Sequence, residues 1–207
     1  MAAKRLLSMI VPVVLLAPMV WAQTNGVSLT GGVTFVSTQS FVDSKGYAHS
    51  IHFENTPSIA ASYSHLLKTM KGLGLHAELP VAVYFRMNLN TQINVIPADI
   101  GALFATPSIR LNAFARDSVS PWVSAGAGYG RFREAPRLNF YGPNPGPTGT
   151  NTSVIQFGAG LDVWFWHNWG FRGEARDFNS GLPAYNVDTG KSRQNNYYVG
   201  AGVMHRF

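Results

Sequence analysis

The chain ends on Tyr197-Tyr198-Val199-Gly200-Ala201-Gly202-Val203-Met204-His205-Arg206-Phe207, a stretch in which two kinds of residue alternate. The odd positions read Tyr, Val, Ala, Val, His and Phe, whereas the even positions carry a tyrosine, two glycines, a methionine and Arg206. A period of two is typical of a strand with two unlike faces. The terminal Phe207 suits a strand that closes a membrane barrel, because the apolar face meets lipid and the aromatic ring lies at the interface.

The same alternation recurs in seven earlier segments, at 26–36, 57–64, 73–85, 103–114, 123–130, 155–165 and 169–176. The connections between them alternate long and short, with long loops at 37–54, 87–99, 134–152 and 179–194 and short turns at 68–72, 116–120 and 167–168. Pro80 disfavours a regular central strand, so a bulge or kink is expected there. The pattern predicts an all-β fold, an eight-stranded antiparallel up-and-down transmembrane β-barrel.

Charged residues within the predicted strands all fall on the even face. They are Glu78, Arg110, Asp162, Arg172, Glu174, Arg176 and Arg206. The apolar odd face carries no charge until Arg131 and Asp177, near strand ends. A soluble sandwich or lipocalin-like barrel would turn its charges outward, whereas a membrane barrel turns its apolar face outward. The even-face charges are therefore predicted to lie in the lumen.

The composition agrees with this interpretation. Charged residues make up 13% of the 207 residues, against about 25% in ordinary soluble domains, and cysteine is absent. Residues 1–22 have a basic start at Lys4 and Arg5, an apolar core and a Val20-Trp21-Ala22 ending, which is typical of a cleaved signal peptide. The barrel domain would then be 23–207, with fourteen basic and ten acidic residues, a net charge of +4. This modest, scattered excess argues against a nucleic-acid partner.

The predicted leader, the eight strands and the terminal Phe207 resemble the small outer-membrane barrels of OmpA and OmpX type. The run 171–178, Phe-Arg-Gly-Glu-Ala-Arg-Asp-Phe, is similar to the penultimate strand of many such proteins. The resemblance implies export to the outer membrane of a Gram-negative cell, and insertion by the barrel-assembly machinery, which reads the last strand and its aromatic end. It carries no peptidoglycan-binding domain over to this chain.

An eight-stranded lumen is just wide enough for side chains, so the inward charges must pair. Hairpin geometry predicts that Asp162 pairs with Arg172 and that Glu78 pairs with Arg110. The triplet Gly-Ala-Gly, at 126–128, 158–160 and 200–202, would make room for large inward side chains. An acid/base pair or an ion path is the alternative role of the charges.

No catalytic, cofactor-binding or metal-binding residues are predicted. His49, His52 and Glu54 share the first long loop, but a solvated loop is expected in preference to a metal site. Trp122, Trp169 and Phe207 are expected at the interface beside the short turns, and Tyr197, with Phe35, Phe85 and Tyr129, at the opposite interface.

These features predict a non-enzymatic outer-membrane barrel that contacts membrane lipid and lipopolysaccharide and whose long loops serve surface interaction or envelope integrity. The extracellular partner cannot be read from the sequence. Two alternatives remain open: a lipopolysaccharide deacylase or acyltransferase, and a small, poorly conducting pore. The enzyme would need a nucleophile beside a histidine on the lipid face, where the sequence offers Val203 beside His205.

Overall fold

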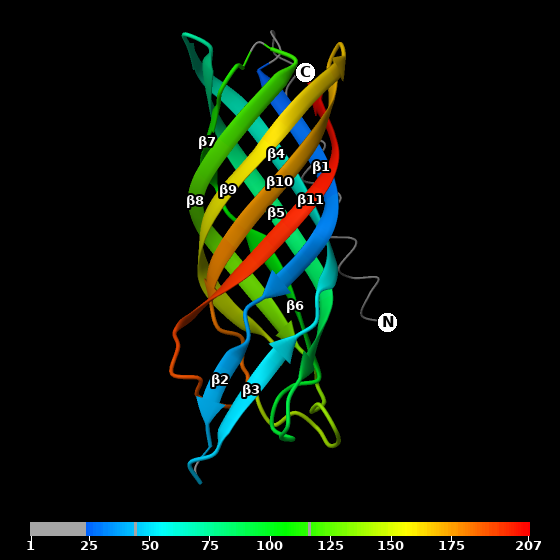
Figure 1. Ribbon diagram of the computed structural model, residues 1–207, viewed down its shortest axis with the longest axis vertical. Helices are drawn as coiled ribbons and strands as arrows, with labels where there is room; N and C mark the ends of the chain where they lie inside the picture. The colour runs from blue at the N-terminus through cyan, green and yellow to red at the C-terminus, as the bar shows by residue number, and fades with distance from the viewer. Residues whose placement is uncertain (1–23, 44, 116) are drawn as a thin grey trace.

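The computed structural model describes residues 24–43, 45–115 and 117–207, and the predicted signal peptide at 1–22 lies outside them. Eleven strands are present in this part of the chain, and the hydrogen-bonded ladders join most of them into a closed cylinder (Figure 1). Their bounds are β1 Asn25–Val36, β2 Gln39–Val42, β3 Ala48–Phe53, β4 Thr56–Met70, β5 Leu73–Asn90, β6 Asp99–Ala105, β7 Ser108–Asn112, β8 Val119–Glu134, β9 Thr150–Trp166, β10 Trp169–Gly181 and β11 Arg193–Arg206. None of the described residues belongs to a helix long and apolar enough to cross a membrane.

The barrel wall has eight antiparallel staves, as predicted; a stave is one strand of the wall, and β6 and β7 together count as one stave. The order around the ring is β1, β4, β5, the β6–β7 pair, β8, β9, β10 and β11, and β11 returns to pair with β1 along its length. Asn25 and Phe207 exchange two backbone hydrogen bonds, of 3.1 and 2.9 Å, so the first and last strands close the seam. Both ends of the barrel chain therefore lie on the short-turn side, at the top of Figure 1.

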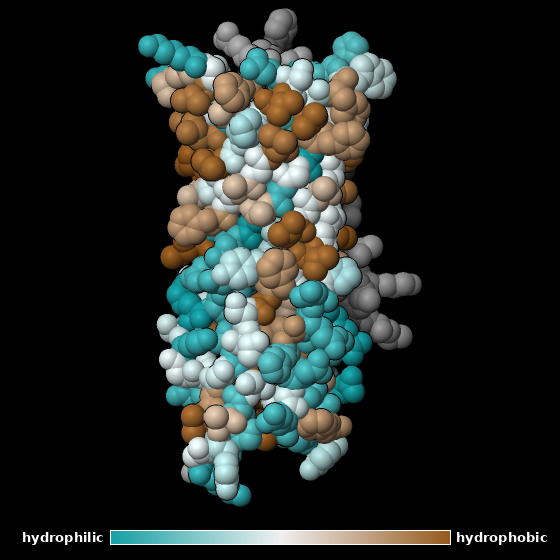
Figure 2. Space-filling view, viewed as in Figure 1, coloured by the Kyte–Doolittle hydropathy of each residue, from teal (hydrophilic) through white to brown (hydrophobic). Residues whose placement is uncertain are grey.

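Alternation of buried and exposed side chains follows the predicted phase through most staves. In β1, for example, Ser28, Thr30 and Thr34 are buried, whereas Leu29 is 55% exposed and Val33 is 40% exposed. Apolar side chains therefore cover the outside of the wall, and Figure 2 shows them concentrated in the half of the cylinder nearer the short turns. We call this outward apolar zone the belt.

Of the bulge or kink expected at Pro80, the structure shows no bulge. Pro80 pairs in register with Ser62, and the irregularity lies one stave away, where Thr106 and Pro107 separate β6 from β7. The carbonyl of Pro80 accepts a hydrogen bond of 3.2 Å from the amide of Thr106. Pro107 likewise accepts a hydrogen bond of 3.2 Å from the amide of Ala127. Proline lacks an amide hydrogen, so neither Pro80 nor Pro107 can return the hydrogen bond that it accepts, and the ladder is interrupted between β6 and β7.

The true register shift of β5 lies between Tyr84 and Met87. It reverses the phase, so Met87 and Leu89 point inward although they have odd numbers. The strands also run further than predicted toward the long loops, and the loop expected at 37–54 contains the β2–β3 hairpin, which projects below the cylinder in Figure 1.

Candidate functional site

A charge network fills the middle of the lumen. Six of the seven predicted lumen charges form it: Glu78, Arg110, Asp162, Arg172, Glu174 and Arg176. They come from β5, β7, β9 and β10, and each is at most 6% exposed. The network holds three guanidinium groups and three carboxylates, so it is neutral as a whole, which is the condition for burying charges without a large penalty.

Glu78 is the centre of the network. Its Oε1 accepts hydrogen bonds from Arg110 at 3.0 Å, from Arg172 at 3.2 Å and from Arg176 at 3.1 Å. The predicted pairing of Glu78 with Arg110 is therefore present, and two further arginines share the same oxygen. One carboxylate thus ties together side chains from three staves.

Two outer pairs complete the charge balance. Arg172 binds Asp162 in a bidentate manner, with Nε–Oδ1 and Nη2–Oδ2 both at 2.8 Å, as their direct cross-strand register predicts. Arg176 Nε donates to Glu174 Oε2 at 2.9 Å. Bidentate arginine–carboxylate pairs fix geometry as well as charge, so the network holds the staves in register.

Trp122 lies inside this network, and its predicted place at the membrane interface is wrong. It occupies an even, inward position of β8, is 3% exposed, and donates from Nε1 to Asp162 at 2.9 Å. The guanidinium carbons of Arg110, Arg172 and Arg176 lie 5.7, 5.1 and 4.9 Å from its ring centre. Gly160 makes this possible, because a Cβ at that position would clash with the ring.

Arg206 stays outside the network, at the short-turn mouth of the barrel. Its guanidinium carbon lies 4.3 Å from the centre of the Trp164 ring, and its Nη2 donates to the carbonyl of His167 at 3.3 Å. A cavity of about 220 Å³ opens at this mouth and reaches down to Arg110 and Arg172. From the short-turn end, the open part of the lumen thus reaches only as far as the charge network.

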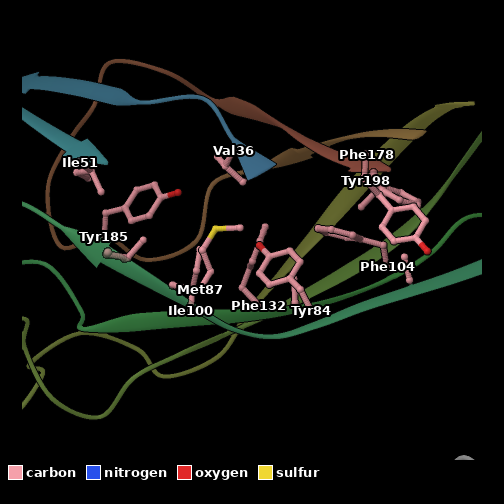
Figure 3. Close-up of a cluster of buried hydrophobic side chains, with 14 of the residues drawn as sticks. Val36, Ile51, Tyr84, Met87, Ile100, Phe104, Phe132, Phe178, Tyr185 and Tyr198 are labelled. Carbon is pink, nitrogen blue, oxygen red and sulfur yellow. The ribbon is translucent and has the colours of Figure 1, made fainter. Parts of the chain in front are cut away.

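An apolar layer closes the other half of the lumen, and the sequence interpretation missed it. Phe104 stacks on Phe178 at 5.1 Å between ring centres and meets Phe132 and Tyr84 edge-on at 5.8 and 6.1 Å (Figure 3). All four are inward positions and at most 2% exposed.

The long loops extend this layer over the barrel end. Ile96 and Tyr185 belong to loops, and Ile51 belongs to β3 in the projecting hairpin; all three join the same buried cluster. Glu134, at the end of β8, binds the hydroxyl of Thr150 at 2.6 Å and the amide of Ala184 at 2.9 Å, which ties two loops together. The structure therefore contains two successive barriers, one ionic and one apolar.

The remaining predicted interface aromatics lie on the outer wall. Trp169 is 45% exposed and Phe207 is 42% exposed, and the ring of His205 packs on both, at 4.7 and 6.1 Å between centres. At the long-loop edge of the belt, Tyr197 packs on Phe35 at 5.7 Å.

The histidines of the first long loop contact neighbouring side chains. His49 lies 3.1 Å from Asp43, and His52 lies 3.3 Å from the hydroxyl of Thr38. Glu54 accepts from Asn88 and Asn90, which lower its pKa below the ordinary value. The described residues contain no cluster of three or more side chains suited to hold a metal ion.

No protein-family model matches the sequence, and no curated protein matches it. Solved structures match over nearly the whole chain. The outer-membrane protein OprG from Pseudomonas aeruginosa is 10% identical, with 89% of this chain and 97% of OprG covered at a TM-score of 0.57. Neisserial surface protein A is 14% identical over 90% of this chain and 98% of its own, at 0.51. The chain has the fold of the small outer-membrane barrels.

A third match is the outer-membrane protein AlkL, solved in lipid bilayers by solid-state NMR. It is 13% identical over 93% of this chain and 94% of AlkL, at a TM-score of 0.51. At such identities the likeness concerns the path of the chain and the closed ring of strands, and the lumen contacts described above belong to this sequence.

Proposed function

We propose that the protein is a non-enzymatic, integral outer-membrane barrel, exported with a cleaved signal peptide, whose closed lumen is structural and whose long loops work at the cell surface. The observation that carries this proposal is an apolar outer wall around a buried, neutral charge network. Such an arrangement is stable only when the wall faces lipid, because in water the exposed belt would drive aggregation.

Surface interaction is assigned to the loops because they display large side chains beyond the barrel. Tyr47 is 66% exposed, Phe140 is 59% exposed and Tyr141 is 76% exposed. Their backbone is held in place: Asn94 Oδ1 accepts from the amides of Phe140 and Tyr141, at 3.0 and 3.2 Å. Ordered loops with exposed aromatic groups suit recognition of another molecule.

The two alternatives receive less support from the contacts of the described residues. A small pore would need a path past both the charge network and the apolar layer. A lipid-modifying enzyme would need an activated nucleophile on the wall. The outward His65 contacts Asn25, at 2.9 Å, and the outward His205 packs on aromatic rings.

The test is fractionation of a Gram-negative cell that expresses the full chain, followed by electrophoresis with and without boiling. The proposal predicts protein in the outer-membrane fraction that migrates faster unheated than boiled. Complete extraction by carbonate, with no heat shift, would contradict it. A comparison of lipid A from cells with and without the protein tests the lipid-modifying alternative. A changed acyl pattern would show that the protein is an enzyme and would contradict the non-enzymatic proposal.

A further inference from the structure

Three arginines of the described chain, none of which has a carboxylate partner, lie on the outer wall just beyond the belt. Along β8 the outward side chains change from Ala127 and Tyr129 to Arg131 and Arg133, both exposed. The same change occurs on β11, where Arg193 lies on the long-loop side of Tyr197. Figure 2 shows the corresponding transition from hydrophobic to hydrophilic side chains along this face.

The strand register brings these groups into one patch. Arg131 pairs with Asn151, and Tyr129 pairs with Ser153 and donates to Asn151 at 2.7 Å. Arg193 reaches across β10 from the other side. It donates to the side-chain and backbone oxygens of Asn179, both at 2.5 Å, and to the Ser153 hydroxyl and carbonyl at 3.4 Å. We define the arginine patch as Tyr129, Arg131, Arg133, Asn151, Ser153 and Arg193.

The positive charge of the patch is not neutralised by the protein. Within the described residues, none of its three arginines forms an ion pair, although Asp177 lies on the same wall of β10, in register with Tyr197. Arg86 provides the contrast: it also lies just beyond the belt, after Phe85, but its Nε is 3.2 Å from Asp99.

We propose that the arginine patch binds the phosphate groups of an anionic glycolipid whose acyl chains lie along the belt of β8–β11. Guanidinium groups bind phosphate oxygens in a bidentate manner, and the tyrosine, amide and hydroxyl groups supply further hydrogen bonds. Charge complementarity selects an anion, and the adjoining apolar wall, with Ile155 and Phe157 exposed next to the patch, selects one that carries acyl chains. The inference rests on the proposed membrane orientation.

The experiment uses the full barrel, purified after export and reconstituted in phosphatidylcholine nanodiscs that contain a small fraction of bisphosphorylated lipid A. The triple variant R131Q/R133Q/R193Q removes the charges, and R86Q is the matched control, an exposed wall arginine that already has a carboxylate partner. The readout is the number of lipid A molecules retained per barrel, by native mass spectrometry. Each basic residue near a membrane surface strengthens binding of anionic lipid by about fivefold. The triple variant should therefore retain about tenfold to a hundredfold less lipid A, whereas R86Q should retain as much as wild type.

Two further arms define the ligand. Dephosphorylated lipid A should bind wild type and triple variant equally weakly, and inorganic phosphate should fail to displace the lipid. Equal retention by wild type and triple variant, or full displacement by inorganic phosphate, would overturn the inference. Heat-shifted migration of every variant is recorded in parallel. If the barrel shows heat-shifted migration but lipid retention does not depend on the arginines, the arginine-patch inference is wrong and the proposed function stands. If wild type shows no heat shift, the proposed function is wrong.

Discussion

Glu78 is the residue on which the lumen depends most. One of its oxygens accepts from three guanidinium groups, and its side chain is fully buried. Substitution Glu78→Gln would leave those cations around a neutral amide. Breaking a buried pair in this way costs about 3–5 kcal/mol, so the folded barrel should unfold at a clearly lower urea concentration in detergent. The control Glu54→Gln neutralises an exposed carboxylate outside the lumen, where a Gln oxygen can still accept from Asn88 or Asn90, and should shift the midpoint far less. An unaltered midpoint for Glu78→Gln would mean that the network carries no net stabilisation.

At this scale the sequence located most of the candidate site. Six inward charges and both predicted pairs follow from the period of two, since phase alone decides which side a residue faces. Trp122 shows where the reasoning failed. Its closeness to a short turn points to the membrane interface, whereas its even number already places it with the inward charges.

The seam between β1 and β11 is the element that makes a sheet into a barrel, and Gly202 permits it. A Cβ at Gly202 would clash with the carbonyl oxygen of Leu29 on β1, whereas one at Gly173, on the outer wall, would meet nothing within 4 Å. We expect Gly202→Ala to weaken closure, at about 1–3 kcal/mol for overpacking, and Gly173→Ala to be tolerated. Heat-shift midpoints of the two variants measure this. Equal heat-shift midpoints for the two variants would show that the seam can accommodate a methyl group at position 202.

The β2–β3 hairpin should loosen in acid. Asp43 has a lowered pKa because the amide of Tyr47 donates to it, with smaller contributions from His49 and the amide of Lys45. A depressed carboxyl pKa stabilises the folded form above the ordinary value of 3.8, and this contribution is lost as the pH falls through the folded value. The protection factor of the Tyr47 amide, which corrects for the pH dependence of the intrinsic exchange rate, should therefore fall below pH 3.8 in wild type and be low already at neutral pH in Asp43→Asn. Equal protection of the Tyr47 amide in the two proteins would show that Asp43 does not stabilise the hairpin.

The extra strand length and the hairpin could not be predicted from pattern. Beyond the belt the outward side chains become polar, as Arg131, Asn151 and Asn179 show, so the contrast between the two faces that marks a strand disappears. The register shift at Tyr84–Met87 hides the inward Met87 and Leu89 in the same way, because it reverses the phase that sequence reasoning extrapolates.

The whole molecule combines an apolar wall, an ionic layer and an apolar layer in one closed cylinder. The ring of eight staves could be predicted, because the number of strands and the lengths of the loops can be read directly from the sequence. The apolar layer joins Phe104, Phe132 and Phe178 to loop residues such as Tyr185, and such contacts between distant segments leave no local signal.

Apart from the phase reversal after Tyr84 of β5, odd positions of the wall face lipid and even positions face a filled lumen. Because the chain has no cysteine, single cysteines can be introduced through residues 59–64 of β4, whose inward residues Ala60, Ser62 and Ser64 are small, and spin-labelled in reconstituted bilayers. Heat-shifted migration of each labelled protein shows that it has folded. Collision rates with oxygen and with a water-soluble nickel chelate then report the surroundings of each position. We predict high oxygen and low nickel access at odd positions, and low access to both reagents at even ones. Nickel access at the odd positions, or no alternation along β4, would contradict the account.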